Sequence, residues 1–188
     1  MRRLRASEYK RMPWKNGKGE TVEIAVFPPG ASIDTFEWRI SMASVANDGA
    51  FSLFPEIDRT LSILSGHGMS LIVDDAAPVL LTMESDPLRF AADVPVDATL
   101  VDGAITDLNV MTRRGRFVHS VERRASPFSV RGCERGETVY LLATGPVTFT
   151  SAGETVKLEA MDCVLVGEDA SVTAENIVCY EIRLQGSA

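Results

Sequence analysis

The stretch ETVYLLATGPVTFTSAGETVKLEAMDCVLVG, residues 137–167, shows the pattern that decides the fold class. It holds four short runs rich in Val, Thr, Leu and aromatic residues, separated by turn-forming Gly, Pro, Glu and Asp. Runs of this length and composition indicate β-strands, because a helix needs a longer periodic segment. The four predicted strands are residues 137–144, 146–151, 154–160 and 162–167.

The same pattern continues in both directions along the chain, at a spacing of about 8–10 residues. Many short strands with regular turn signals are typical of an all-β sandwich or barrel. Only segment 47–58 has a helix-like appearance, and Gly49 and Pro55 make it a loop with at most one helical turn. We therefore expect less than about a fifth of the residues in helix. The further strand candidates are residues 21–27, 36–43, 59–65, 69–73, 78–83, 98–102, 106–112, 126–132, 170–174 and 176–185.

A length of 188 residues fits one large domain or two small fused halves. No low-complexity linker is present, and the weak boundary near 115–125 coincides with a basic stretch. Of 19 Lys and Arg residues, seven lie in 1–18 and seven in 113–135. We predict two β-barrel halves packed in one compact body, residues 1–118 and 119–188.

Composition excludes several classes of protein. The net charge of −7 argues against general nucleic-acid binding. No apolar run approaches the roughly 20 residues of a membrane helix, and no apolar segment follows the charged N-terminus as in a signal peptide. The three cysteines form no CxxC pair, so neither a disulfide framework nor a zinc site is indicated. We expect a reduced, cytoplasmic protein that binds neither nucleic acid nor membrane.

Strand alternation places polar side chains together on one face of two predicted strands. In 36–42, Arg39 and Ser41 lie opposite the face that holds the large apolar residues. In 106–112, Asp107, Asn109 and Met111 share a face. These faces either contact solvent, as antiparallel sheets often do, or line a pocket inside a barrel. In the second case Asn109 offers both donors and acceptors to a ligand.

Two loops add candidates to this pocket. Residues 11–24 hold Trp14 and Asn16 in a glycine-rich loop before a strand, where a large aromatic residue is unusual. Phe51 lies in segment 47–58 and is either a core residue or a loop plug. Arg59 starts a strand beside Asp58, so it either forms a surface ion pair or points into a cavity. Arg39 is likewise either a ligand-binding group or a structural partner of Asp107.

Metal and nucleophile signals are weak. The two histidines, His67 and His119, form no HxH motif, and a transition-metal site needs several N or S ligands. No GxSxG motif or activated cysteine is apparent. We therefore predict no metal, no cofactor and no catalytic residue, and leave open acid–base chemistry by Asp107.

Four features carry a resemblance to a known family. They are the loop PWKNGKGET (13–21), the segment FEWRISMASVANDGAFSLFPEIDRTLSILSGHGM (36–69), the strand DLNVMTRRG (107–115) and the spacing between them. Over residues 8–118 the chain resembles the HutD/Ves family of small bacterial proteins. It departs from the family pattern at Lys18, where a glycine is typical, at Ala50, where a proline is common, and at Glu56, where a glycine is common.

The resemblance implies a cupin-type β-barrel, here two such halves in a bicupin arrangement, and a link to histidine utilisation. It also implies that the 13–21 loop borders the pocket, with Trp14 as a wall and Asn16 at the mouth. Combined with strand alternation, this gives a set of predicted ligand-binding residues. They are Trp14, Asn16, Arg39, Ser41, Phe51, Arg59, Asp107, Asn109 and Met111.

Three functions remain open from the sequence. The first is a metal-independent binding protein for a small anionic metabolite such as urocanate, with a regulatory or accessory role. The second is a metal-independent isomerase or hydrolase that acts on a small carboxylate with Asp107 as the base. The third is an interaction module whose basic segments contact an acidic partner. Of these we favour the binding protein, and we leave a homodimer open.

Overall fold

The computed structural model describes residues 1–14 and 19–187. Within these residues the chain forms β-strands throughout, and its helical content is one 3-10 turn, η1 (Ala6–Glu8). The predicted all-β fold is confirmed. Segment 47–58 contains the two-residue strand β5 (Gly49–Ala50) and a turn, with no helix. No helix in the described part of the chain is long and apolar enough to span a membrane.

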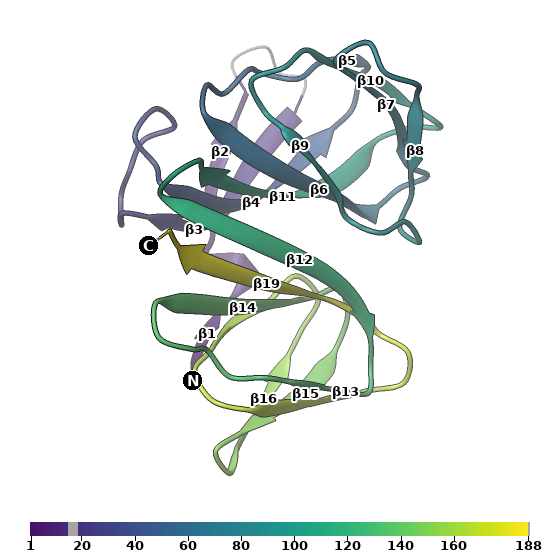
Figure 1. Ribbon diagram of the computed structural model, residues 1–188. Coiled ribbons are helices and arrows are strands. Elements are labelled where there is room, and N and C mark those ends of the chain that lie inside the picture. Colours follow the sequence, from purple (N-terminus) through teal and green to yellow (C-terminus); the bar gives the residue numbers. More distant parts are fainter. Residues whose placement is uncertain (15–18, 188) are drawn as a thin grey trace. The chain divides into compact units, whose positions relative to one another are not determined.

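The chain divides into two compact units: a first unit of residues 10–117, and a second unit of residues 1–9 and 118–188. Figure 1 shows the strands of both. The first nine residues were expected in the N-terminal half. They are part of the second unit, because β1 (Arg2–Leu4) pairs with β17 (Cys163–Val166).

The first unit contains two antiparallel sheets. In spatial order, the six-stranded sheet consists of β2 (Lys10–Pro13), β3 (Gly19–Phe27), β4 (Trp38–Val45), β11 (Ile105–Arg113), β6 (Ile57–Ser65) and β9 (Leu88–Ala91). The four-stranded sheet consists of β5, β10 (Val96–Leu100), β7 (Met69–Val73) and β8 (Val79–Leu81).

The second unit also contains two sheets. The five-stranded sheet consists of β1, β17, β14 (Glu137–Ala143), β19 (Val178–Gly186) and β12 (Phe117–Ala125). The four-stranded sheet consists of β13 (Phe128–Val130), β18 (Ala170–Thr173), β15 (Val147–Ser151) and β16 (Glu154–Leu158).

The two units share one strand order. The runs β4-β11-β6-β9 and β5-β10-β7-β8 of the first unit correspond to β12-β19-β14-β17 and β13-β18-β15-β16 of the second. Each of the strands β12 to β19 therefore comes eight strands after its counterpart, while β1 is an additional strand of the second unit. This correspondence allows a comparison of the two interiors, although a bicupin made of two cupin halves stays a prediction.

Alternation along the strands builds a separate apolar core in each unit. In the first unit the buried cluster includes Leu61 and Ile63 of β6 together with Met69 and Leu71 of β7. In the second unit it includes Val139, Leu141, Phe149, Val164 and Val172. The first core fills only part of the inner face of its six-stranded sheet, and polar side chains occupy the rest.

Five strands were not predicted: β1, β2, β5, β9 and β12. Four of them are at most four residues long. The fifth, β12, has the sequence FVHSVERRA and carries mainly polar and charged side chains. Its composition resembles a surface loop, whereas its backbone pairs with β19 at the edge of the five-stranded sheet.

Candidate functional site

A pocket of about 820 Å³ opens on the inner face of the six-stranded sheet in the first unit. Its size is within the usual range for small-molecule sites. Asn16 lies outside the described residues. The other eight predicted ligand-binding residues all line this pocket: Trp14, Arg39, Ser41, Phe51, Arg59, Asp107, Asn109 and Met111.

The strand register explains how residues distant in sequence meet in this pocket. Met111 on the central strand β11 lies between Arg39 on β4 and Arg59 on β6. Two residues earlier on β11, Asn109 pairs with Ser41. Side chains in such cross-strand rows point to the same face of the sheet. The sheet therefore presents two arginines in one row and hydrogen-bonding groups in the next.

Asp107 lies two residues further along β11, between Ala43 of β4 and Ile63 of β6. Both neighbours belong to the apolar core. Its carboxylate is therefore at the apolar end of the polar face and is 1% exposed.

Arg39 is held by a carboxylate that the sequence analysis did not identify. Its Nε donates a hydrogen bond of 2.8 Å to Oε2 of Glu23 on the neighbouring strand β3. The proposed alternative of an Arg39–Asp107 pair does not occur among the described contacts. A register shift between Glu23 and Ala25 interrupts the alternation of β3, so a strict two-residue period does not show which face Glu23 occupies.

Arg59 has a different environment. Its guanidinium carbon lies 5.2 Å from the ring centroids of both Phe51 and Phe54, and 5.9 Å from that of Phe90. It is 5% exposed, and its Nε has no hydrogen-bond partner in the described part of the chain. Aromatic faces attract a cation but accept no strong hydrogen bond from it. A buried cation whose Nε donor is unused within the described residues therefore lines the pocket.

Burial lowers the pKa of Arg59 to about 10, a net value that includes an opposing effect of the Asp107 charge and a smaller lowering by the positive charge of Arg39. A guanidinium at this pKa is still charged at neutral pH. The shift shows that holding this charge in the pocket costs free energy.

Asp107 is the buried acid of the site. Nδ2 of Asn109 donates a hydrogen bond of 2.6 Å to Oδ1 of Asp107. Burial raises the pKa of Asp107 to about 7, an effect that the charge of Arg59 and hydrogen bonds from the Ala43 backbone and Asn109 reduce. This carboxyl therefore changes its charge near neutral pH.

Trp14 forms a wall of the pocket. Its indole Nε1 donates a hydrogen bond of 2.9 Å to Oγ1 of Thr21, and its backbone N–H donates to the carbonyl of Gly19, also at 2.9 Å. A Cβ on Gly19 would lie 2.8 Å from the Trp14 ring and close to the carbonyl oxygen of Ser44. A glycine after the loop therefore lets the indole pack against the strand that follows.

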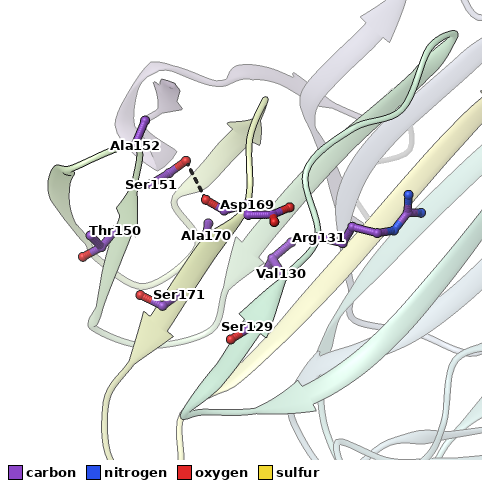
Figure 2. A pocket seen from close by; sticks show the side chains of 9 residues that line it. All are labelled: Ser129, Val130, Arg131, Thr150, Ser151, Ala152, Asp169, Ala170 and Ser171. Carbon is purple, nitrogen blue, oxygen red and sulfur yellow. Dashed lines mark hydrogen bonds between the residues drawn. The ribbon is translucent and has the colours of Figure 1, made fainter.

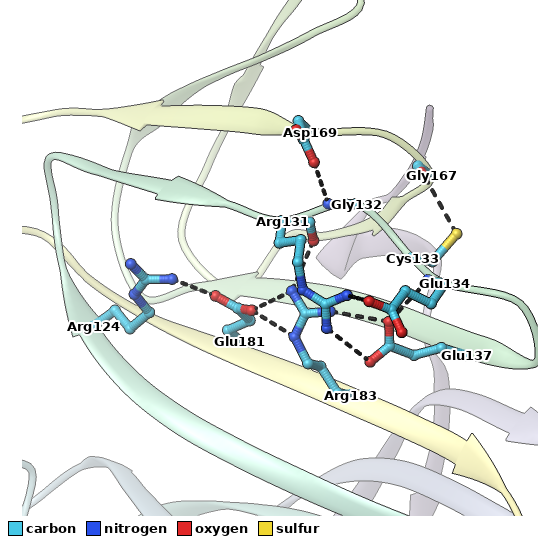
Figure 3. Close-up of polar contacts among 10 residues, drawn as sticks. All are labelled: Arg124, Arg131, Gly132, Cys133, Glu134, Glu137, Gly167, Asp169, Glu181 and Arg183. Atoms are coloured by element: carbon cyan, nitrogen blue, oxygen red, sulfur yellow. Dashed lines mark hydrogen bonds and ion pairs between the residues drawn. The ribbon is translucent and has the colours of Figure 1, made fainter.

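The equivalent inner face of the second unit carries charges that are already paired. Glu181 and Arg183 on β19, the counterpart of β11, lie opposite core residues Leu141 and Val139 of β14. Figure 3 shows Glu181 between two arginines. It accepts from Arg124 at 2.6 Å, and from Nε and Nη2 of Arg183 at 2.8 and 2.7 Å.

The same network of ion pairs continues from β19 to Glu137 on the neighbouring strand β14. Arg183 also contacts Glu137 at 3.1 Å, and Arg131 contacts both Glu134 and Glu137 (Figure 3). Glu137 and Glu181 thus act as internal counterions of these arginines. The second unit therefore offers an incoming anion less unpaired positive charge than Arg59 offers in the first.

A second hollow, of about 580 Å³, lies in the second unit. Figure 2 shows the hydroxyl groups of Ser129, Thr150 and Ser171 around it, while the guanidinium of Arg131 extends away. Ser151 donates to the backbone carbonyl of Asp169 at 3.1 Å. The hollow has neither the buried cation nor the apolar walls of the first pocket.

The histidines lie outside the first pocket. His67 is an exposed side chain 3.5 Å from Asp102, and His119 is buried in the second unit. Within the described residues, no three His, Cys, Asp or Glu side chains are grouped so that they could hold a metal ion.

Comparison with known proteins places this geometry in a family. The HutD family model matches residues 6–179. The chain belongs to the HutD family. It is 39% identical over 140 residues to the protein Ves of Citrobacter koseri, which covers 72% of this chain and 71% of Ves. It is 38% identical over 173 residues to an uncharacterised 21.2 kDa protein of Pseudomonas putida from the hutC 3′ region. This match covers 88% of this chain and 87% of the Pseudomonas putida protein.

Solved structures that are similar to this chain have the same fold. A conserved protein of unknown function from Pseudomonas aeruginosa matches with a TM-score of 0.87 and 32% identity, over 100% of this chain and 99% of that one. HutD from Pseudomonas fluorescens matches with a TM-score of 0.81 and 31% identity, over 100% of this chain and 99% of HutD. A cupin barrel protein from Leptotrichia buccalis, at 10% identity and a TM-score of 0.58, covers 98% of this chain and 100% of its own. The fold is therefore cupin-like.

Proposed function

We propose that this HutD-family protein binds a small monocarboxylate in the pocket of its first unit and has a regulatory or accessory role in histidine utilisation. The observation that carries the proposal is Arg59, a buried cation that lines the pocket with an unpaired Nε. The name HutD and the hutC-region origin of the Pseudomonas putida relative support the pathway. Urocanate, a flat acid with an imidazole ring, is the first candidate ligand.

The charges around the pocket favour one negative charge on the ligand. Arg39 and Arg59 bring two positive charges, and Glu23 already neutralises Arg39. Asp107 is largely neutralised by its raised pKa when the pH is below about 7. About one positive charge, on Arg59, is then left for an anion, and guanidinium groups bind carboxylates well.

Other residues give the pocket its shape. Trp14 and Phe51 provide apolar walls suited to a flat ring, and Ser41 and Asn109 provide hydrogen-bonding groups. We propose that the protein acts in the cytoplasm without binding nucleic acid or membrane.

A thermal-shift screen tests the proposal. Urocanate, other acids of histidine breakdown and the neutral amides of the same compounds are added to the purified protein. An acid at 100 times its dissociation constant adds about 2.7 kcal/mol to the free energy of unfolding. We expect acids to raise the melting temperature and their amides to have little effect.

Two variants show where the acid binds. Arg59→Met removes the unpaired cation, and we expect affinity to fall about 10- to 150-fold. Arg89→Met on neighbouring β9 is the control, because Arg89 is half exposed and paired with Asp58 at 2.7 Å. Equal affinity of wild type and Arg59→Met for the acid would contradict the proposal.

One observation favours a second candidate, acid–base catalysis on a small carboxylate. A carboxyl with a pKa of about 7 in a pocket is suited to general acid–base work. Incubation of the protein with each stabilising acid, followed by proton NMR, tests this function. A new product that Asp107→Asn fails to form would replace binding with catalysis as the function.

A further inference from the structure

The proposed function leaves Asp107 unexplained, since a second carboxylate beside an anion site opposes binding. Its side chain is buried and lines the same pocket as Arg59. Among the described residues no ion pair joins it to a cation. The side-chain amide of Asn109 donates a hydrogen bond of 2.6 Å to its Oδ1.

The charged groups around Asp107 come from three neighbouring strands and one loop. Arg59 faces it from β6, and Arg39 of β4 is bound to Glu23 of β3. Asp48, in the pocket wall, accepts a hydrogen bond of 2.8 Å from the backbone of Leu100. Of these two arginines, Arg59 is the one with no carboxylate bound to it within the described part of the chain.

A ligand carboxylate on Arg59 uses this charge. Asp107 then loses the attraction that favours its ionised form and gains a like charge in the same buried space. Two carboxylates that share one cation away from water do not both stay ionised, because the second negative charge is neither solvated nor paired. The proton that relieves this conflict comes from bulk water.

We propose that Asp107 is a neutral carboxylic acid in the ligand complex, that an anion binding to the protein with ionised Asp107 brings one proton into the pocket, and that the Asp107 O–H donates a hydrogen bond to the ligand. The favoured ligand is a monocarboxylate with a hydrogen-bond acceptor, a carbonyl oxygen or an unprotonated ring nitrogen, at the end away from its carboxylate. This inference rests on the proposed function.

The direction of the pH effect follows from the proton balance. If binding takes up one proton, affinity falls about tenfold for each pH unit above the pKa of Asp107 in the free protein. Below that pKa the proton is already bound, so affinity is constant until the ligand itself is protonated.

Calorimetry with furylacrylate tests the inference, because this urocanate analogue has a ring oxygen acceptor and no titrating ring. Titrations at about pH 6.5 and about pH 8.5 should differ at least tenfold in affinity. Titrations at the higher pH in two buffers with different ionisation enthalpies should show about one proton taken up per ligand. Pyrrolylacrylate, whose ring donates instead of accepting, should bind more weakly.

Asp107→Asn supplies a permanent neutral donor in the same place. We expect it to bind furylacrylate at both pH values about as tightly as wild type does at the lower pH. Asp48→Asn, which changes another carboxylate of the pocket, should keep the pH dependence of wild type. The proton uptake of the wild type needs no variant, so it tests the inference even if a variant fails to fold.

The outcomes separate this inference from the proposed function. If neither urocanate nor any other acid binds at the lower pH, the proposed function is wrong, and this inference with it. If furylacrylate binds equally at both pH values without proton uptake, the proposed function stands and the inference is overturned. Binding of urocanate or pyrrolylacrylate but not furylacrylate also overturns the inference, because it excludes a ligand acceptor at Asp107.

Discussion

Glu23 and Arg39 form an ion pair of 2.8 Å between adjacent strands β3 and β4 at the edge of the pocket. Both side chains are largely buried, so each depends on the other for neutralisation. This pair makes Arg39 mainly a structural residue, in contrast to Arg59, which lies in the same cross-strand row and has an unpaired Nε.

Arg39→Ala should therefore lower stability more than ligand affinity. Removing one partner of a buried pair leaves an uncompensated charge, and we expect a loss of about 3 kcal/mol in the free energy of unfolding. Glu23→Ala should cost a similar amount, and the double variant less than the sum of the two. Urea unfolding of all three variants measures this coupling. Additive losses would show that the pair does not stabilise the unit.

Arg59→Met should act in the opposite direction on stability. The wild-type guanidinium is buried among three aromatic rings with an unused Nε, and methionine fills similar space without a charge. Replacing a buried, poorly paired ion with an apolar side chain stabilises by about 1–4 kcal/mol. The half-exposed control Arg89→Met should change stability by less than about 1 kcal/mol. A clear loss of stability in Arg59→Met would mean that the cation–ring contacts hold the unit together.

Gly19→Ala should destabilise the first unit. The added methyl group meets the Trp14 ring and the Ser44 carbonyl, and overpacking of this kind costs about 1–3 kcal/mol. Gly167→Ala is the control, because no atom lies within 4 Å of its added Cβ. Thermal unfolding, together with Trp fluorescence as a probe of the indole, distinguishes the two variants. Equal melting temperatures of Gly19→Ala and Gly167→Ala would show that the Trp14 ring shifts to accommodate the added methyl group without loss of stability.

Much of the fold was predictable because each unit repeats the same local signals. Short Val- and Thr-rich runs bounded by turns predicted strands at 69–73 and 146–151, within a residue of the observed β7 and β15. Strands with other compositions were missed. In β12 and β9, pairing with neighbours determines the extended backbone, and no local pattern of apolar residues signals it.

The pocket was predictable where alternation holds. Alternation placed Arg39, Asp107 and Asn109 on shared polar faces because β4 and β11 keep a two-residue period over their positions. The family resemblance then favoured the pocket over solvent. Glu23 was missed because a register shift in β3 breaks that period. Phe90 was missed because its contact with Arg59 depends on the pairing of β9 with β6, which no local signal indicates.

Asp162→Asn should lower stability at neutral pH and remove part of the acid sensitivity of the second unit. Burial alone would raise the pKa of Asp162, but hydrogen bonds from the backbone of Glu159 and Ala6 and from Arg3 hold it below its usual value. This carboxylate therefore stabilises the fold above its unfolded pKa, and the stabilisation is lost as pH falls through the lower folded pKa.

Wild type and Asp162→Asn should accordingly differ most above about pH 5 and converge towards about pH 3. Urea unfolding followed across this range measures the difference. For Asp97→Asn, at an exposed position on β10, the free energy of unfolding should change with pH as it does in wild type. A constant gap between wild type and Asp162→Asn at every pH would show that the lost hydrogen bonds, and not the charge, cause the effect.

The three cysteines should differ sharply in reactivity. Cys133 is exposed, and its thiol donates to the carbonyl of Gly167 at 3.2 Å (Figure 3). Cys163 and Cys179 are fully buried in the sheet of the second unit, and burial raises the pKa of Cys179 to about 12 and that of Cys163 well above its usual range. Thiolates are the reactive form, so buried thiols at such pKa values are inert.

A disulfide reagent should therefore modify one thiol per native chain quickly and all three after unfolding, with Cys133→Ser lacking the fast reaction. Two or more fast thiols in the native protein would contradict the packing of β17 and β19 against β14.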